Sequence, residues 1–501
     1  MTGSNKFKAL LLTMSAALVL ASCSGGGSEV ASPGEGGFNG GSGGGDNGGG
    51  SGGGNGGTVP ADCPENFTNA GLIANNTLRN CELPTLITGN LVVPLRQNTV
   101  YSINGRVRVG QDVGGDASNP IAGRQTGTLT IEPGVTLFGS AGLDYLLVNR
   151  GSRLLADGTV GQPIVFTSRQ DLEGTAGADT MGQWGGVIML GRAPISNCNA
   201  TGATPGTATC ERVIEGTQSD LYGGNATEDN SGRLTFVQIR FTGYALSAGN
   251  ELQGLTLGGV GRGTTIHHVQ SHNSADDGIE IFGGNVNLRH IVLTGNDDDS
   301  LDTDNGYNGK IQFVIATQRQ TAPTDSGSRL VESSSAGTAP RSNPKIANFT
   351  FIGRSRSGDD GLVANSNTNT GFYNGIVVLP NGAPNGAVNI GGAGDGTVFH
   401  SVFLDADVAF AGSAATDGDT AAARFAEGSN NNASYTNTLT NLFVNGNQEA
   451  TRPVFNITTL NGGTGGDTFF QSVNYVGAVR DSSDTWWQGW TCGLPGEETC
   501  H

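Results

Sequence analysis

The amino-acid sequence predicts an all-β protein built as a parallel β-helix, and three observations lead to this fold class. From residue 129 onward, short β-rich runs alternate with Gly, Asn and Asp, and helical periodicity is almost absent. A short pattern, h-x-x-h-x-h with h apolar, recurs along the chain. The shortest step between copies separates Ile266 from Leu288, and the longest separates Phe399 from Leu439. The shortest steps fit one turn of a solenoid, and insertions between strands account for the longer ones.

The repeated pattern places three residues of each copy in a common core. The copies begin at Leu234, Leu288, Ile311, Ile346, Tyr373, Phe399, Leu439 and Phe470, with a weaker copy at Ile266. Because side chains alternate along a strand, the apolar positions face inward, and stacking buries what a single rung leaves exposed. We therefore expect one continuous solenoid over residues 125–485, without an inserted globular domain.

The segment 1–22 has the organisation of a secretory signal peptide. Lys6 and Lys8 precede an apolar stretch that ends just before Cys23. The stretch is too short to cross a bilayer, which favours a cleaved signal over a membrane helix. The segment 23–60 that follows is mostly Gly, Ser and Asn, a composition typical of a flexible tether.

Residues 20–23, Leu-Ala-Ser-Cys, resemble the bacterial lipobox. The resemblance implies cleavage before Cys23, diacylation of its sulfur and acylation of the new amino group, with chains such as palmitate. Several acyl chains anchor a protein stably to a membrane. Ser24 follows the cysteine where an Asp would favour the inner membrane, so we expect the outer membrane. The sequence leaves open whether the protein is on the periplasmic or the outer face of that membrane. Plain secretion is the alternative to lipid anchoring.

The acidic composition limits the possible partners. The formal net charge is −18, which argues against nucleic acid and anionic lipid surfaces. It is compatible with divalent cations, with cationic ligands or simply with solubility. We expect contact with the membrane through the lipid anchor, and a glycan or another envelope protein as partner.

Six cysteines besides Cys23 fall into three local pairs, Cys63/Cys81, Cys198/Cys210 and Cys492/Cys500. The sequence leaves their connectivity open, but local disulfides are the simplest arrangement and agree with export to an oxidising compartment. A metal-thiolate site is the alternative, although it usually needs closer C-x-x-C spacing.

The two ends of a solenoid need covers, because an open rung exposes apolar residues and unpaired strand edges. Residues 61–124 are less regular than the repeat and are expected to form an N-terminal cap. Residues 486–501 contain three tryptophans and the last cysteine pair, and we expect them to cap the C-terminal end. An aromatic platform for sugars is the alternative role of these tryptophans.

Several stretches between residues 130 and 188 differ from the later rungs. They include Thr130–Leu137, Leu146–Gly151, Leu154–Thr159, Pro163–Ser168 and Trp184–Ile188. Together with Asp302–Gly306 and Trp486–Trp490, they resemble a family of bacterial right-handed parallel β-helix lipoproteins and secreted proteins. The resemblance implies a right-handed β-helix over most of residues 125–492. It implies little about activity, since the same fold carries lyases, hydrolases, adhesins and scaffolds.

Two acidic segments one rung apart form the strongest candidate site. Residues 276–280, Asp-Asp-Gly-Ile-Glu, align with residues 298–302, Asp-Asp-Ser-Leu-Asp, at the same offset that separates Ile266 from Leu288. Neighbouring rungs lie about 4.8 Å apart, so Asp276 should lie over Asp298 and Asp277 over Asp299. Carboxylates at this spacing repel one another unless a pKa rises, water reaches them or a cation binds.

Calcium fits this oxygen-rich set because it accepts many oxygen ligands in irregular geometry. The candidate ligands are Asp276, Asp277, Asp298, Asp299, Asp302 and Asp304. The alternative is that these acids cap turns by accepting backbone hydrogen bonds. A second candidate is the pair His268 and His290, separated by the same one-rung offset, which could bind a transition metal or a carboxylate, or could be an ordinary surface ladder.

These features favour a lipid-anchored, calcium-stabilised β-helix of the cell envelope with a binding or scaffolding role. The alternative is a calcium-dependent polysaccharide lyase, which combines an acidic cluster with a Lys or Arg base. Lys310 and Arg289 are the nearest candidates in rung sequence. Stacked acids would, however, favour the protonated form of such a base.

Overall fold

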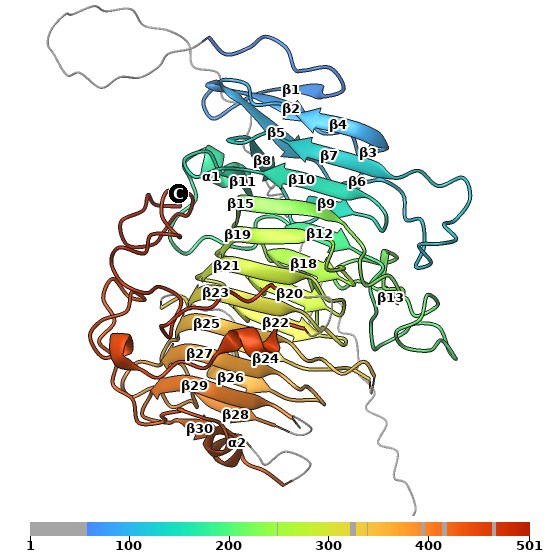
Figure 1. The fold of residues 1–501 in the computed structure, drawn as a ribbon. Helices are drawn as coiled ribbons and strands as arrows, with labels where there is room; N and C mark the ends of the chain where they lie inside the picture. The colour runs from blue at the N-terminus through green and yellow to red at the C-terminus, as the bar shows by residue number, and fades with distance from the viewer. Residues whose placement is uncertain are drawn as a thin grey trace, which may run out of the picture. The chain divides into compact units, whose positions relative to one another are not determined.

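The structure is a computed structural model that describes residues 58–500 apart from 248, 321–326, 338, 392–395, 413–417 and 463–466. The expected signal peptide, Cys23 and most of the tether lie outside the described residues. The described part is a right-handed parallel β-helix, in which the chain winds through two long sheets (Figure 1). The prediction of the fold class is therefore confirmed.

One long sheet, sheet A, is parallel apart from one terminal strand. Its main path runs through β2 (Leu78–Glu82), β5 (Thr99–Ile103), β8 (Thr136–Gly139), β11 (Ile164–Ser168), β15 (Gly232–Arg240), β19 (Thr265–His272), β21 (Asn287–Thr294), β23 (Lys310–Thr317), β25 (Lys345–Ile352), β27 (Gly371–Val378) and β29 (Val398–Asp405). A side branch of β4 (Gly89–Val93), β7 (Gly127–Ile131) and β10 (Arg153–Asp157) joins it at β15. The antiparallel strand is β1 (Thr68–Ile73), which pairs with β2.

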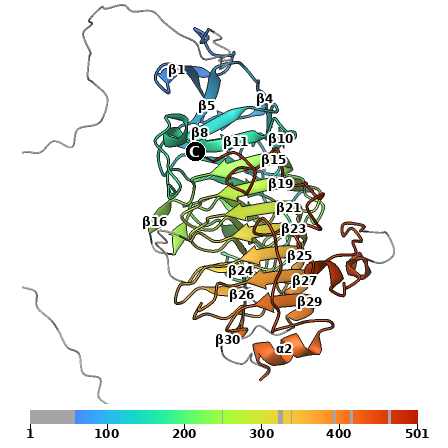
Figure 2. The ribbon, with the colours of Figure 1, turned by 90° about the vertical axis from the view of Figure 1, so that its left-hand side faces the viewer.

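The opposite sheet, sheet B, is parallel throughout. It runs through β3 (Leu86–Ile87), β6 (Arg106–Val109), β9 (Tyr145–Val148), β12 (Val187–Leu190), β18 (Leu255–Gly258), β20 (Ile279–Phe282), β22 (Leu301–Asp304), β24 (Arg329–Ser333), β26 (Asp360–Ala364), β28 (Val388–Ile390) and β30 (Phe410–Ala411). Successive rungs stack along the axis (Figure 2). Their inward side chains form one apolar core that extends from Cys81 to Phe425.

The longer strands of sheet A turn a corner at one residue with positive φ. The corner residues are Phe236, His268, His290, Phe313, Asn348, Asn374 and Ser401. Strand register is regular on both sides of the corner, as where Thr235 pairs with His267 and Val237 with Val269. This corner explains the h-x-x-h part of the repeat, because the first x faces outward and the second is the corner itself. The copy predicted to begin at Tyr373 is wrong by one residue, since the inward residues of β27 are Phe372 and Val377 and the corner is Asn374.

The N-terminal boundary differs from the expected one. Residues 78–109 already form rungs of both sheets, so the predicted cap over 61–124 is too long. The cover seen in the described residues is the segment from residue 58 through β1, which Cys63–Cys81 ties to β2 with an S–S distance of 1.99 Å. Phe67 packs on Tyr101 of β5, with ring centroids 5.0 Å apart.

The C-terminal boundary also differs. Sheet B ends at β30, and helix α2 (Ala421–Glu427) covers the last rung through Phe425, which contacts Phe399 and Phe410. The pattern copies at Leu439 and Phe470 are not rungs, because no strand is found in the described residues beyond 411. The predicted range 125–485 is thus wrong at both ends.

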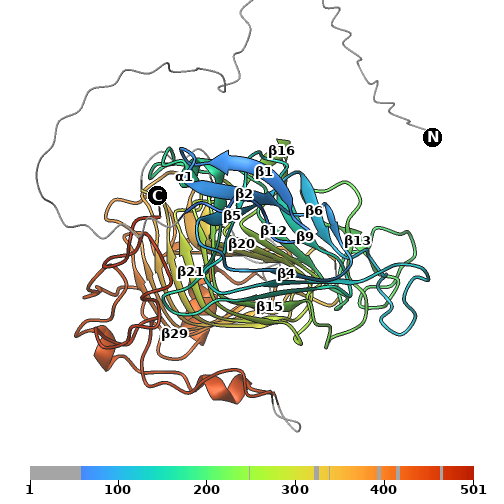
Figure 3. The same ribbon diagram turned by 90° about the horizontal axis from the view of Figure 1, so that it is seen from above.

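The described residues of the segment 428–500, here called the strap, return along the outside of sheet A instead of extending the solenoid (Figure 3). The strap carries two short 3-10 helices, η1 (Glu449–Thr451) and η2 (Ile457–Leu460). Its tryptophans reach the rungs of β15 to β23, where Trp490 contacts Phe236 and Trp486 contacts His290. They therefore do not cap the C-terminal end, and no open aromatic platform is formed by Trp487 and Trp490, which are buried.

The remaining elements are short. They are helix α1 (Arg169–Leu172) and the antiparallel pairs β13 (Arg212–Val213) with β14 (Leu221–Tyr222) and β16 (Ala245–Ser247) with β17 (Asn250–Glu251). Disulfides Cys198–Cys210 and Cys492–Cys500 form as predicted, with S–S distances of 1.99 and 2.02 Å. Among the described residues, no helix is long and apolar enough to span a membrane.

Candidate functional site

The outer face of sheet B carries a ladder of carboxylates from three consecutive strands. Glu280 of β20 pairs in register with Asp302 of β22, and Asp302 pairs with Glu332 of β24. The flanking residues Ile279 and Leu301 belong to the core, so alternation directs the carboxylates outward. The ladder is therefore a consequence of strand register.

The turns that lead into β20 and β22 add four more acids beside this ladder. The acid cluster, as named here, comprises Asp276, Asp277, Glu280, Asp298, Asp299 and Asp302. One oxygen from each of Asp276, Asp277 and Asp298 lies within 4.8 Å of the others, and the same holds for Asp277, Glu280 and Asp302. Asp277 is common to both groups, so the two triads form one continuous oxygen-rich surface.

Part of the cluster also caps turns. Asp277 Oδ1 accepts a hydrogen bond from the backbone N–H of Asp299 at 2.9 Å, and Asp299 Oδ1 accepts one from Arg329 N–H at 2.6 Å. Each bond ties one rung to the next. A capping carboxylate still has a second oxygen, so turn capping and cation binding are compatible at these residues.

The electrostatic environment disfavours the charged form of these carboxylates. Burial, and then the charge of Asp298, raises the pKa of Asp276, while burial and Asp276 do the same for the pKa of Asp277. Burial and Asp302 raise the pKa of Glu280. In addition, Asp302 Oδ1 is buried and has no hydrogen-bond partner among the described residues. A cation would remove both the repulsion and the unsatisfied acceptor.

The cluster extends into a cavity of about 350 Å³ beside the β13–β14 hairpin. Its lining includes Glu215, Glu280 and Asp304. Burial, followed by repulsion from Glu251, raises the pKa of Glu215 to about 7. Asp304 Oδ1 accepts a hydrogen bond from Ala336 N–H at 2.9 Å, so this predicted ligand lies at the edge of the cluster and holds a turn.

Sequence reasoning missed three acids of this face. Glu280 stands in the quoted motif, one regular rung before Asp302, and that offset is the signal that identifies it. Glu332 follows Asp302 after a longer step, since an insertion separates β22 from β24. Glu215 comes from the segment between β12 and β15, and no periodicity connects it to the rungs.

The predicted histidines lie elsewhere. His268 and His290 stack at the corner of sheet A with ring centroids 4.3 Å apart, between Phe236 and Phe313. Burial lowers the pKa of His268 to about 4 and that of His290 to about 2. Stacked rings present their faces to one another, and the groups of three or more metal-ligand side chains found in the described residues contain only acids.

Lys310 and Arg289 are also remote from the cluster. Both stand near the start of sheet A strands, β23 and β21, whereas the acids lie in the turns after β19 and β21 and on the sheet B strands β20 and β22. Lys310 Nζ pairs with Asp467 at 2.7 Å, and Arg289 lies over the ring of Phe469 at 4.5 Å. Both cationic side chains therefore interact with residues of the strap. Arg329 lies beside the cluster: its charge interacts with Asp299 and Asp298, and its Nε lies 3.5 Å from Glu332.

The two long parallel sheets and the polar outer face define a protein of the β-helix class. The pectate-lyase-like β-helix domain family matches residues 93–491, and the chain belongs to that family. Comparison with curated proteins and with solved structures finds no match.

Proposed function

We propose that this protein is a cell-envelope β-helix that binds calcium at the acid cluster and serves a binding or scaffolding role toward glycans. The membrane attachment in this proposal is the lipid on Cys23. A pectate-lyase-like β-helix domain is compatible with a carbohydrate-related function. The observation that carries the proposal is the in-register ladder of Glu280, Asp302 and Glu332 beside the two triads that share Asp277.

The physical argument for calcium is the crowding of negative charge. Six carboxylates crowd two rungs, where the charge of Arg329 interacts with Asp299 and Asp298. Calcium binds oxygen ligands at roughly 2.3–2.6 Å and accepts irregular geometry. An ion held between adjacent rungs converts their repulsion into attraction and stabilises the fold by mass action.

The state of the basic side chains favours a binding role over catalysis. A lyase needs a base that loses its proton near neutral pH. Burial opposes the charge of Arg329, but Asp299 and Glu332 outweigh it and raise the pKa of this guanidinium. Lys310 and Arg289, which sequence reasoning suggested as bases, contact the strap. The lyase alternative rests on Arg329, because it is an arginine next to a candidate calcium site.

Calcium titration of the full chain tests the proposal. We expect isothermal titration calorimetry to detect calcium binding in the wild type, and E280Q combined with D302N to weaken it at least about tenfold, because both changes remove charge with little change in shape. E65Q is the matched control, since Glu65 is exposed and lies before the first rung. Absence of binding in the wild type would refute the proposal.

The same preparation separates binding from catalysis. Acidic polysaccharides incubated with the calcium-loaded protein should be retained without the rise in ultraviolet absorbance that unsaturated sugars give. Such a rise, lost in R329Q, would establish the lyase alternative.

A further inference from the structure

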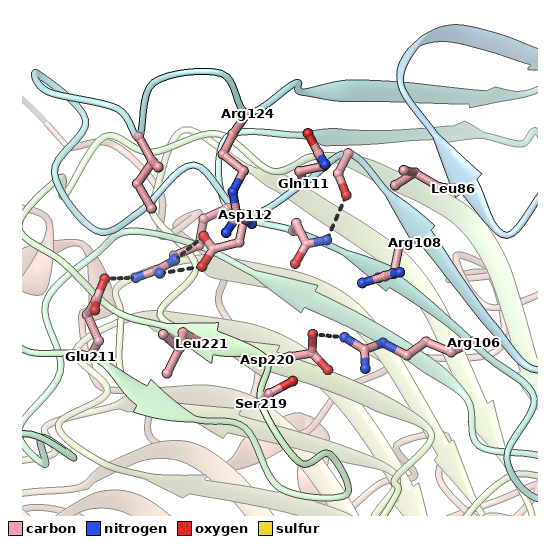
Figure 4. A pocket seen from close by; sticks show the side chains of 14 residues that line it. Leu86, Arg106, Arg108, Gln111, Asp112, Arg124, Glu211, Ser219, Asp220 and Leu221 are labelled. Carbon is pink, nitrogen blue, oxygen red and sulfur yellow. Dashed lines mark hydrogen bonds and ion pairs between the residues drawn. The ribbon is translucent and has the colours of Figure 1, made fainter.

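A second pocket, of about 390 Å³, lies on the outer side of sheet B toward its N-terminal rungs. Its floor is β6, and its walls are the loop after β6 and the chain around the β13–β14 hairpin (Figure 4). Thr217 and Tyr222 of the same hairpin region line the cavity beside the acid cluster. The hairpin, which follows disulfide Cys198–Cys210, thus separates an arginine-rich pocket from an acidic one.

Two of the four arginines in this arginine pocket form ion pairs with acidic side chains. Arg150 is 1% exposed and pairs with Asp112 and Glu211, each at 2.6 Å. Arg106 pairs with Asp220 across the pocket floor (Figure 4). These pairs fix the walls and hold the pocket open.

The other two arginines, Arg108 and Arg124, are exposed and line the same cavity. Within the part of the chain that the structure describes, neither has an ion pair or a side-chain hydrogen bond. Two atoms of the ion pair between Arg106 and Asp220 are also unsatisfied, because Arg106 Nε and Asp220 Oδ2 are buried without a partner. The pocket therefore offers guanidinium donors and one carboxylate acceptor that no described protein group uses.

We propose that the arginine pocket binds an oxyanion-bearing sugar, with the carboxylate or phosphate held by Arg108 and Arg124. A guanidinium recognises either group through paired N–H donors. Asp220 Oδ2 accepts a ligand hydroxyl, which a free inorganic anion lacks. Leu86 and Ile121 are exposed at the pocket and give apolar surface for the body of the ligand. The volume lies within the range of small-molecule sites, roughly 300–1,000 Å³.

This inference does not depend on calcium, because none of the acid cluster lines the arginine pocket. Its test is therefore performed in EDTA, where failure of the calcium proposal has no effect on the result. The probes are glucose 6-phosphate, glucuronate and neutral glucose, titrated into the full chain at low ionic strength. We expect one or both anionic sugars to bind and glucose not to bind.

Two variants examine the named side chains. R108Q and R124Q should each weaken binding about tenfold or more, since a charge-assisted hydrogen bond to an oxyanion is lost. Neither residue is buried, so both variants should fold. R153Q is the matched control, because Arg153 is exposed on β10 of sheet A. E280Q should also leave binding unchanged.

The results separate the two sources of the oxyanion. Binding of glucose 6-phosphate alone identifies phosphate, and binding of glucuronate alone identifies a carboxylate. The proposal is overturned if neither anionic sugar binds more tightly than glucose, or if R153Q weakens binding as much as R108Q and R124Q do.

Discussion

The side-chain amide of Gln270 holds both backbone groups of Cys492, with Nε2 donating to the carbonyl at 2.8 Å and Oε1 accepting from the N–H at 2.9 Å. Gln312 holds Gln471 in the same way, at 2.9 and 2.8 Å, and Asn374 holds Phe455. Side-chain amides of sheet A thus make the backbone hydrogen bonds with the strap that a neighbouring strand would otherwise make. The strap is fixed by polar pairing as well as by aromatic contacts.

Removal of one of these amides should loosen the strap. In Q270A the N–H and C=O of Cys492 stay buried, since this residue is 0% exposed, but they lose their partners. We expect a loss of about 1–3 kcal/mol in the free energy of unfolding, measured in urea. Hydrogen exchange should accelerate first in residues 486–500. Q488A, on an exposed residue of the same segment, is the control, and equal effects of the two variants would contradict the pairing argument.

The stacked histidines should make the strap sensitive to acid. The pKa of His290 is about 2, lowered by burial and by the neighbouring His268 and Arg289, whereas its ordinary value is 6.5. The unfolded chain therefore binds more protons below pH 6.5, and the contribution of His290 to stability is lost as the pH falls from 6.5 toward 2.

H290F should remove this contribution to the pH dependence. Phenylalanine continues the stack between Phe236 and Phe313 and also removes His290 Nδ1, which is buried without a partner among the described residues. We expect H290F to be at least as stable as the wild type at pH 7 and to lose less stability at pH 5, measured by urea unfolding at both values. Parallel pH profiles of the two proteins would show that His290 titrates normally.

The sequence was sufficient to predict the solenoid because the corner of sheet A imposes a local pattern. A residue with positive φ, such as His268, lies between two inward residues, Ile266 and Val269. The strap shows a similar spacing of apolar residues, although it does not form a rung. Phe470 of the strap is buried against the outside of sheet A, and apolar spacing alone does not distinguish the outer from the inner surface of a strand.

The acid cluster was predictable only where rungs have equal length. Asp276 and Asp298 are one regular rung apart, so their register could be read from the sequence. Glu332 follows Asp302 at a longer spacing although its strand is the next in the sheet. The arginine pocket depends on Asp220, which belongs to a distant insertion and contacts Arg106. Such a contact cannot be predicted from the spacing of residues within a repeat.

The lipid anchor is a prediction about residues outside the described part. The lipobox-like residues 20–23 motivate it. C23A should move the protein from the membrane fraction to the soluble fraction, because the acylated sulfur is the only proposed attachment. The measurement is fractionation of cells followed by a carbonate wash. S24A, which keeps the cysteine, is the control and should stay with the membrane. Retention of C23A after the wash would contradict the prediction.

The acid cluster and the neighbouring Glu215 should give calcium a pH-dependent effect on stability. The pKa of Glu215 is raised from 4.5 to about 7, so the folded protein binds more protons than the unfolded chain between these values. This contribution is fully present below pH 4.5 and is lost as the pH rises through 7. In EDTA, stability should therefore rise as the pH falls from 8 to 6, by at most about 1.4 kcal/mol per pH unit for each titrating group.

Calcium should flatten this slope, because the ion replaces protons as the counter-charge of the carboxylates. At pH 8 and a concentration about 100 times Kd, calcium should stabilise the protein by roughly 2.7 kcal/mol. Urea unfolding at pH 6, 7 and 8, with calcium and with EDTA, measures both effects. D299N should reduce the response to calcium, since it removes a charge but keeps the oxygen that accepts from Arg329 N–H. Identical unfolding with calcium and EDTA at all three pH values would leave turn capping as the role of these acids.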